Sequence, residues 1–377
     1  MIRILRKTAC RVLCGVLTFG MIVSLAGGEG FKIPDGDRVF EFPRDHGNHP
    51  DYRIEWWYLT GHLRESEEGR RFGFQATFFR FGQDPREEAH FKGSPAFGVD
   101  QTFMAHFALV EPGRGLYEHA ERLHRDGWAA HSREGFLEVV NGDWELEMVD
   151  FDTEAMRLRG GPPGSWLDVE LLPQKPLVRF GVDGVSPKGP DPDAVSYYLS
   201  FTRLETSGKL HWQGKDLRVE GVAWMDHEIA SNQLSEGLVG WDWTAIHLDD
   251  GREIKAYRLR EADGGASPFS DFYWIDREGE TTRLGADGFV WENRAYWTSP
   301  KTGGVYPHTV RLNFEDPQTG AETYLDIVPL LDDQEITGSG GGIAYWEGAC
   351  DVFDPDGKRV GKAYLELTGY SEPLGGE

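Results

Sequence analysis

Apolar and polar residues alternate along this chain in short runs, and turn signals interrupt those runs at close intervals. A period of two broken by Gly, Asn and Asp clusters is typical of antiparallel strands joined by tight turns. The run 139–144 (VVNGDW) predicts the clearest two-residue hairpin, and further turns are expected at 207–208, 250–251, 278–279, 317–320 and 354–357. Only the stretch 116–124 hints at a helix, with Leu116, Ala120 and Leu123 on one stripe. The chain is therefore predicted to be nearly all β.

The absence of strand–helix alternation excludes doubly wound folds, and the absence of a repeat of 20 to 50 residues disfavours propellers and solenoids. A large antiparallel sheet avoids exposed edges by closing on itself, so one or two barrels are expected. The polar stretch 229–237 lies between Trp-containing strands and is the expected junction. We predict an N-terminal domain at 29–232 and a C-terminal domain at 233–377, both antiparallel β-barrels.

Charge and composition narrow the partners of this protein. The 377 residues carry a formal charge of -24, and such a surface repels phosphate backbones and anionic headgroups. We therefore expect no nucleic-acid partner. The chain also contains 13 Trp, 13 Tyr and 22 Phe, an aromatic excess for an ordinary globular protein.

The first 28 residues resemble a Sec-type signal peptide. They combine Arg3, Arg6 and Lys7 with an apolar run at 12–25, followed by small residues spaced for signal peptidase. A retained membrane anchor is the alternative, but the apolar run is short for a bilayer. We expect a periplasmic or secreted protein without a stable membrane anchor after cleavage. Cys350 is then the only cysteine left, so no internal disulfide is expected.

Common catalytic motifs are missing. There is no Gly-x-Ser-x-Gly elbow, and no second histidine follows His227-Glu228 at zincin spacing. The glycines at 338–342 lack the Lys-Ser/Thr of a phosphate loop, so they are interpreted as a flexible turn. His46 and His49 lie with Asp45 and Asp51 near prolines and are interpreted as solvated loop residues. No metal site and no cofactor are predicted.

A strand at 222–228 would place Trp224, Asp226 and Glu228 on one face and His227 on the other. A carboxyl group buried beside Trp has a raised pKa and can hold a proton at neutral pH, as a general acid must. The alternative is that Asp226 and Glu228 accept structural hydrogen bonds or pair with Arg.

Aromatic residues occupy both faces of several predicted strands. In one predicted strand, Glu55 and Trp57 share a face and Tyr58 lies on the other. In a second strand, Trp241 and Trp243 share a face. In a third, His106 lies on the face opposite a Phe-rich one. A sheet with one solvated face is polar on that face. The second face is therefore either covered by another domain or lines a cavity for an apolar ligand.

Five blocks resemble the AttH-type family, which includes carotenoid 1,2-hydratases (hydroxyneurosporene synthases), proteins described as predicted secreted hydrolases, and fungal Diels–Alderases. They are YRIEWWYLTG at 52–61, GVAWMDHE at 221–228, GWDW at 240–243, YWEGA at 345–349 and AYLELTGY at 363–370. The resemblance implies two lipocalin-like barrels packed together, with a pocket in or between them for an apolar substrate. In the hydratases a Tyr-x-Asp stands where this chain has Trp224-Met225-Asp226, so only the aspartate carries over.

The resemblance implies a cofactor-free acid–base enzyme, a hydratase, isomerase or hydrolase, for an isoprenoid or lipid-like substrate. Asp226 is the candidate acid. Two alternatives stay open: a lipocalin-like lipid carrier with structural carboxylates, and an ester hydrolase whose water is activated by His227 or a carboxylate. The candidate catalytic residues are Asp226, His227, Glu228 and Glu55, and the candidate ligand-binding residues are Trp57, Trp224, Trp241, Trp243, Tyr58 and His106.

Overall fold

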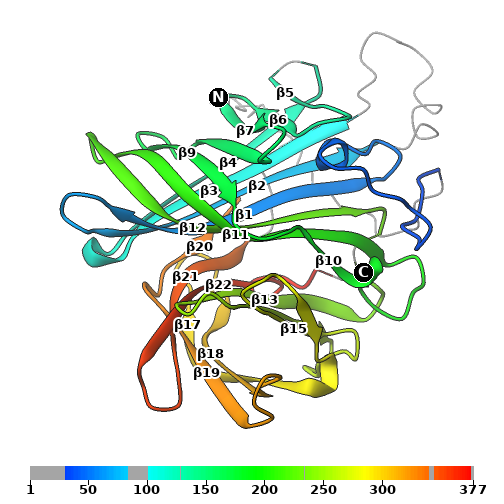
Figure 1. The fold of residues 1–377 in the computed structure, drawn as a ribbon, viewed down its shortest axis with the longest axis vertical. Helices are drawn as coiled ribbons and strands as arrows, with labels where there is room; N and C mark the ends of the chain where they lie inside the picture. Colours follow the sequence, from blue (N-terminus) through cyan, green and yellow to red (C-terminus); the bar gives the residue numbers. More distant parts are fainter. Residues whose placement is uncertain (1–29, 84–100, 128, 233, 339–343, 375–377) are drawn as a thin grey trace, which may run out of the picture.

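The computed structural model describes residues 30–83, 101–127, 129–232, 234–338 and 344–374. These residues form two antiparallel sheets, as the alternation predicts, with short 3-10 helices at η1 (Arg44–His46), η3 (Pro112–Arg114) and η4 (Ala286–Gly288) (Figure 1). No helix among the described residues has the length and apolar character that a membrane span requires. The predicted export segment and the glycines at 340–342 lie outside the described residues.

The N-terminal sheet has twelve strands in the order β4-β3-β2-β1-β12-β11-β9-β8-β7-β6-β5, with β10 paired to β11. The strands are β1 (Ile54–Glu65), β2 (Arg71–Gly82), β3 (Gln101–Glu111), β4 (Leu116–Arg125), β5 (Ala130–Ser132), β6 (Glu138–Asn141), β7 (Trp144–Asp150), β8 (Ala155–Gly160), β9 (Trp166–Pro173), β10 (Val178–Pro187), β11 (Val195–Trp212) and β12 (Lys215–Ala230).

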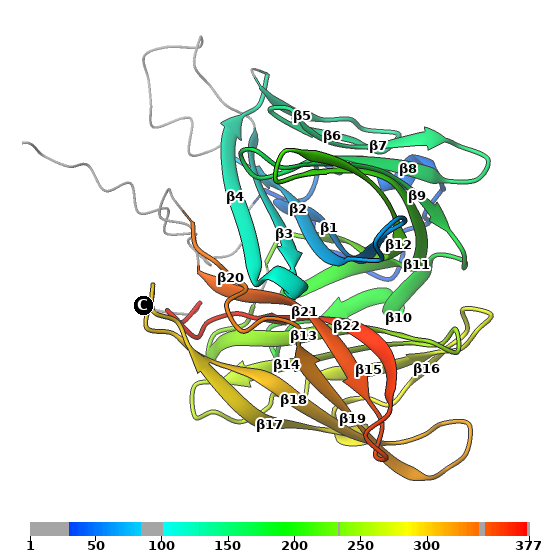
Figure 2. The ribbon, with the colours of Figure 1, turned by 90° about the vertical axis from the view of Figure 1, so that its left-hand side faces the viewer.

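Side chains join the two ends of this sheet. Arg122 of β4 donates to the carbonyl of Asn141 in β6 at 3.0 Å, and Asn141 Nδ2 donates to the carbonyl of Phe103 in β3 at 3.3 Å. Because both edges are bridged, the sheet forms a nearly closed barrel, visible in the upper half of Figure 2.

The C-terminal sheet has ten strands in the order β16-β15-β14-β13-β22-β21-β19-β18-β17, with β20 paired to β21. The strands are β13 (Leu238–Leu248), β14 (Glu253–Glu261), β15 (Asp271–Ile275), β16 (Thr281–Arg283), β17 (Phe289–Thr298), β18 (Val305–Glu315), β19 (Glu322–Pro329), β20 (Glu335–Ile336), β21 (Tyr345–Phe353) and β22 (Arg359–Leu367).

Apolar side chains fill the inside of each curved sheet. In the N-terminal sheet, Trp57, Phe74, Phe107 and Trp144 belong to one buried cluster. In the C-terminal sheet, a second cluster includes Trp346, and its neighbours come from every strand between β13 and β22 except β16 and β20. Burial of this area supplies most of the folding free energy.

The predicted hairpin at 139–144 is confirmed, since Asn141 and Trp144 are register partners. Two local predictions are wrong. The stretch 116–124 is strand β4, because all of it pairs with β3. The expected turn at 207–208 lies inside β11: a Cβ on Gly208 would come within 2.2 Å of the Asp168 carbonyl oxygen, so this glycine permits close strand approach.

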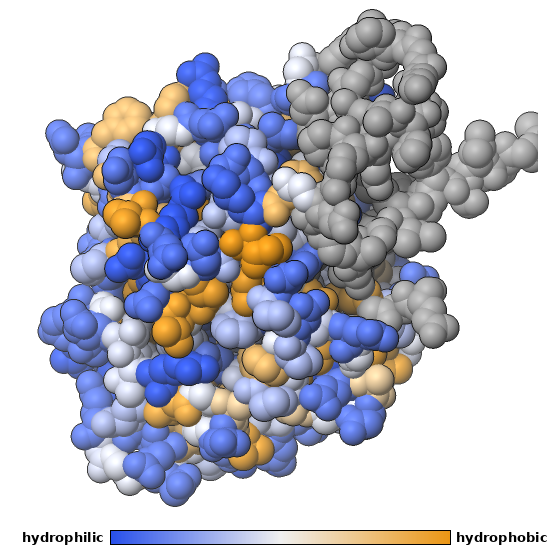
Figure 3. Space-filling model, turned by 90° about the vertical axis from the view of Figure 1, so that its right-hand side faces the viewer, coloured by the Kyte–Doolittle hydropathy of each residue, from blue (hydrophilic) through white to orange (hydrophobic). Residues whose placement is uncertain are grey.

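The two sheets pack face to face along β1, β12 and β11 on one side and β13, β14 and β21 on the other (Figure 2). We call this layer the seam. Its fully buried apolar residues are Tyr58, Val110, Val178, Phe180, Tyr198, Trp224, Leu238, Trp243, Ala245, Tyr257, Leu259, Tyr273, Ile275, Ala349 and Tyr364. On the face shown in Figure 3, hydrophobic residues gather at mid-height among hydrophilic ones.

Candidate active site in the seam between the two sheets

A row of polar side chains crosses the N-terminal sheet on the face that packs against the C-terminal sheet. Strand register places Asp226 of β12 between Tyr58 of β1 and Ser200 of β11. The same row continues from Tyr58 through Thr77 of β2 to His106 of β3. Because side chains alternate along each strand, all five point to the seam.

Asp226 is 2% exposed and accepts three hydrogen bonds from the N-terminal sheet. Its Oδ2 accepts from the Tyr198 hydroxyl at 2.6 Å, and its Oδ1 accepts from Trp224 Nε1 at 2.6 Å and from the Ser200 hydroxyl. Burial raises the pKa of Asp226 above its usual value, although Lys255 and these hydrogen bonds oppose the rise. This carboxyl group can therefore hold a proton in a dry site.

Lys255 of β14 comes from the opposite sheet and was missed by the sequence analysis. Its Nζ lies 3.1 Å from the ring centroid of Tyr198 and 4.0 Å from that of Phe180. This amine has no hydrogen-bond partner in the part of the chain that the structure describes. Burial drives its pKa well below the usual lysine value, and the charge of Asp226 opposes that fall. An acid and an amine thus face each other with both neutral forms favoured by burial.

Aromatic rings surround Asp226. Trp243 Nε1 donates to the Tyr198 hydroxyl at 3.0 Å, and the Trp243 ring packs edge-on against Tyr58 at 5.1 Å and against Trp224 at 6.3 Å. Trp241 is half-buried and packs against the same cluster. Four predicted ligand-binding residues, Tyr58, Trp224, Trp241 and Trp243, therefore lie in the seam.

Two carboxyl groups of the C-terminal sheet lie in the same layer. The Tyr58 hydroxyl donates to Glu347 Oε1 of β21 at 2.7 Å, while the buried Glu347 Oε2 has no partner among the described residues. Glu366 of β22 is the register partner of Glu347 and is half-buried. Burial raises the pKa of both groups, the charge of Glu366 raises that of Glu347 further, and the pKa of Glu366 reaches about 8. The family-like blocks contained both residues, but nothing in the sequence paired them.

Glu228 lies on the same face of β12 as Asp226 but is already paired. It accepts a hydrogen bond from the Ser196 hydroxyl and forms a 3.0 Å ion pair with Lys188. His106 lies farther along the row, where it contacts the Tyr345 hydroxyl at 2.7 Å and Glu121 at 3.2 Å. Strands β2 and β1 lie between His106 on β3 and Asp226 on β12. Because neighbouring strands are about 4.8 Å apart, His106 is too far from Asp226 to contact it.

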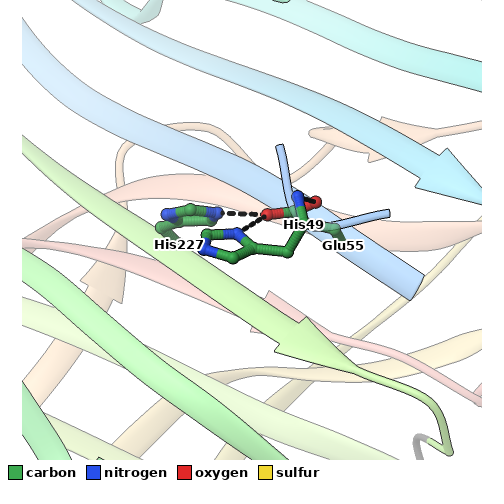
Figure 4. Close-up of side chains that lie close together, drawn as sticks. All are labelled: His49, Glu55 and His227. Atoms are coloured by element: carbon green, nitrogen blue, oxygen red, sulfur yellow. Dashed lines mark hydrogen bonds and ion pairs between the residues drawn. The ribbon is translucent and has the colours of Figure 1, made fainter. Parts of the chain in front are cut away.

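Glu55, Trp57 and His227 point to the opposite face, into the N-terminal barrel. Trp57 stacks on His227 with ring centroids 4.9 Å apart. One Glu55 oxygen contacts both His49 Nδ1 and His227 Nε2 at 2.8 Å, as Figure 4 shows. The other accepts from Arg80 Nε at 3.0 Å and from the His49 backbone at 2.9 Å. Three of the predicted residues therefore belong to a different cluster from Asp226.

The charges in this second cluster are compensated. Burial would raise the pKa of Glu55, but the charge of His49 and the hydrogen bonds from His227 and His49 hold it well below its usual value. Burial lowers the pKa of His227 to about 4. His46 and His49 are only 1% and 7% exposed, so the interpretation as solvated loop residues is wrong. They help to fill the barrel end.

The ligand atoms of His49, Glu55 and His227 lie within 4.8 Å of one another, a spacing that could hold a metal ion. Arg80 is fully buried and bound to Glu55. A divalent cation would add charge beside this guanidinium, and both histidines would lose their hydrogen bonds to Glu55. The donor set therefore fits a hydrogen-bond network around Glu55 better than a metal centre, although His227 Nδ1 and Arg80 Nη1 have no hydrogen-bond partner among the described residues.

A cavity of about 410 Å³ opens at one end of the seam. Its lining is largely polar and includes Arg203, Glu220, His247 and Lys362. The ring of His247 lies 6.2 Å from that of Trp224, so the cavity approaches the Asp226 cluster from the far side of this tryptophan.

Comparisons with known proteins place the fold. A family model described as AttH-like matches residues 34–370. A crystal structure of a Nitrosomonas europaea protein described as AttH is 34% identical, covers 90% of this chain and 100% of its own, and superposes with a TM-score of 0.79. None of the curated proteins matches the chain.

Two more distant structures share the fold alone. Kievitone hydratase from Nectria haematococca is 14% identical, covers 92% of this chain and 95% of its own, and has a TM-score of 0.63. The structure of CghA with Sch210972 is 13% identical, covers 92% of this chain and 98% of its own, and has a TM-score of 0.52.

Proposed function

Because this chain belongs to the AttH-like family, we propose that it is an acid–base enzyme that acts in the seam, without a cofactor, on an apolar isoprenoid or lipid-like substrate. The observation that carries the proposal is the buried Asp226 carboxyl, 2% exposed and enclosed by Tyr198, Trp224 and Trp243. A raised pKa among buried aromatic side chains is the environment that a general acid needs at neutral pH.

Hydration of an alkene fits this arrangement. The protonated Asp226 transfers its proton to one carbon of the double bond, and the pair of π electrons forms the new C–H bond. The faces of Trp224, Trp243 and Tyr58 stabilise the resulting carbocation, as aromatic rings stabilise cations. Water then adds to the cationic carbon, and its surplus proton returns to the carboxylate. The net change is the addition of one water molecule.

The hydrogen bonds to Asp226 support the second half of this cycle. After proton transfer, the carboxylate keeps three donors, Tyr198, Ser200 and Trp224, already in place. Preorganised donors stabilise developing charge without reorganisation. Lys255, the neutral amine favoured by burial, is the nearby group that can relay this proton from the attacking water to the Asp226 carboxylate, so that the acid is regenerated.

A non-catalytic lipid carrier is the competing function. A lipocalin-like carrier holds its ligand inside the barrel. Here buried apolar side chains occupy both interiors, including Trp57 and Phe107 in one and Trp346 in the other. A carrier function would therefore require the seam as well. Mass spectrometry of small molecules extracted from the protein, purified from its own host, tests this alternative.

The test of the enzyme proposal is Asp226→Asn. This change removes the transferable proton and keeps the size of the side chain. In H₂¹⁸O, the wild-type protein should add ¹⁸O to members of a terminal-alkene isoprenoid panel, whereas the variant should lose at least about 10²-fold in kcat. Asp326→Asn, at a half-buried pair with Arg311 in the C-terminal sheet, is the matched control and should keep full activity. Full turnover by Asp226→Asn, with an unchanged thermal transition, would refute the mechanism.

We propose that the protein acts after export, which the basic and apolar pattern of residues 1–28 supports. Fractionation of the host, with N-terminal sequencing of the exported form, tests this. Recovery of the full-length chain from the cytoplasm would contradict it.

A further inference from the structure

The seam contains a second set of carboxyl groups that the Asp226 mechanism does not use. Glu347 and Glu366 face each other on β21 and β22 as direct register partners. Cβ atoms of directly opposed residues on antiparallel strands lie about 5 Å apart, and like charges at such positions repel. Glu347 is 1% exposed and Glu366 is half-buried, so water screens this repulsion only from the Glu366 side.

Among the residues that the structure describes, no cation forms an ion pair with either carboxyl group, and no basic group is among the main influences on the pKa of either one. The neighbouring polar groups are neutral or acidic: the Tyr58 hydroxyl bonds Glu347 Oε1, and Trp241 bonds Glu366. The titratable groups that face the pair are Tyr58 of β1, Tyr117 of β4, Asp226 and Glu228 of β12, Asp242 of β13, Tyr345 and Cys350 of β21, and Tyr364 of β22.

The buried Glu347 Oε2 has no partner among the described residues. An ionised carboxylate oxygen in that position would lose its hydration without compensation, which disfavours the charged form. A protonated carboxyl group removes the charge and lets one oxygen donate a hydrogen bond to the facing carboxylate. One proton shared between the two opposed carboxyl groups would remove this cost.

We infer that Glu347 and Glu366 share one proton and form a second proton-donating centre of the seam, opposite Asp226. The inference rests on the proposed function, because both centres would serve the same substrate. Asp226 belongs to the N-terminal sheet and the pair to the C-terminal sheet, so a substrate between them would meet one acid on each side. Tyr58 lies beside Asp226 in the row and donates to Glu347, which places its hydroxyl between the two centres.

The half-buried Glu366 gives the pair access to solvent for reprotonation. After a proton leaves for the substrate, water at this edge can return one without opening the seam. Glu347, behind it, keeps the bond to Tyr58. We therefore assign Glu366 as the group that exchanges protons with solvent and Glu347 as the group that faces the substrate.

The sharing of a proton is tested without a substrate. Protein labelled with [δ-¹³C]glutamate is titrated by NMR, and Glu347→Gln and Glu366→Gln assign the two signals. The Glu366 carboxyl should stay protonated at pH 7 and titrate near pH 8. In Glu366→Gln the remaining Glu347 should titrate at least about one pH unit lower than in the wild type, because the facing charge is gone. Glu322→Gln, on the exposed face of β19, is the control and should change neither signal.

Two ionised carboxylates at pH 7 would overturn the inference. The catalytic role has its own readout: Glu366→Gln should lower kcat at least about tenfold at pH 7, leave KM within about threefold, and remove the high-pH limb of the rate profile. An unchanged high-pH limb would refute that role.

Failure of the proposed function gives a different result. If Asp226→Asn keeps full turnover, the proposed function is wrong, but the NMR titration still decides whether Glu347 and Glu366 share a proton.

Discussion

The Glu55 cluster separates a structural role from a catalytic one, and Glu55→Ala tests it. Glu55 is fully buried and accepts two hydrogen bonds from His49 and one each from His227 and Arg80. Removing it leaves the fully buried Arg80 guanidinium without its counter-ion. Breaking one partner of a buried ion pair costs about 3–5 kcal/mol of unfolding free energy. For a domain of this size, that loss lowers Tm by about 10 °C.

The assay is urea and thermal unfolding followed by tryptophan fluorescence, because Trp57 stacks on His227 within the cluster. The double variant Glu55→Ala/Arg80→Met removes the stranded charge as well. It should recover about half of the lost free energy, since an uncharged pair has no uncompensated ion. Turnover per folded molecule should stay within about threefold of the wild type.

The opposite result would refute this assignment. A loss of stability below about 1 kcal/mol, combined with loss of turnover, would restore Glu55 as the catalytic residue that the sequence pattern suggested. The pH dependence gives a second check. Because the pKa of Glu55 is lowered in the folded state, its stabilising contribution is complete above the ordinary glutamate pKa and is lost as the pH falls below it. Wild-type stability should therefore decrease on acidification, and Glu55→Ala should decrease less.

Two further changes act on the seam. The raised pKa of Glu366 means that the folded state binds a proton that the unfolded chain releases, so its stabilising contribution is lost as the pH rises from about 4.5 to about 8. Glu366→Gln should remove this dependence. Relative to the wild type, the variant should gain about 1–2 kcal/mol more unfolding free energy at pH 9 than at pH 5, a modest figure because partial exposure weakens the effect. Urea unfolding of both proteins at the two pH values measures this gain, and an equal gain at both would contradict the shift. Lys255→Met replaces a buried amine without a hydrogen-bond partner among the described residues, so Tm should stay equal or rise, while kcat should fall at least about tenfold. A lower Tm with normal kcat would show that Lys255 only stabilises the fold.

The alternation of side chains could be predicted because most strands are buried on at least one face. Trp224, Asp226 and Glu228 share one face of β12, and His227 takes the other, as the period of two predicts. The prediction failed where burial is weak. Strand β4 lies at a sheet edge and is half-buried along most of its length, so its pattern carries no clear period.

Glycine was ambiguous for a similar reason. Gly208 was interpreted as a turn residue but lies inside β11. The turn between β11 and β12 is Gln213-Gly214, where both residues have positive φ, as a type I′ hairpin requires. A glycine that allows close strand approach and a glycine that allows positive φ look alike in a sequence, and only the pairing register distinguishes them.

The partners of the site residues could not be predicted from spacing. Tyr58 and Glu347 are 289 positions apart, and their contact depends on how the two sheets pack. A lysine in a strand is normally expected to face solvent, so nothing in the sequence indicates that Lys255 is buried. Only the opposing sheet, which brings Tyr198 over its amine, shows that it is buried. The sequence identified the aspartate face, but the other half of the seam came from the tertiary structure.

Neighbouring residues of β12 illustrate why burial alone does not make a catalytic acid. His227 and Asp226 are both 2% exposed. His227 binds a carboxylate that also holds Arg80 and His49, so the charge of that carboxylate is compensated. Asp226 faces neutral donors and an amine whose charged form burial disfavours, and burial raises its pKa above the usual aspartate value. A general acid needs a desolvated group whose pKa is raised, and for this reason we propose the seam rather than the barrel as the place of proton transfer.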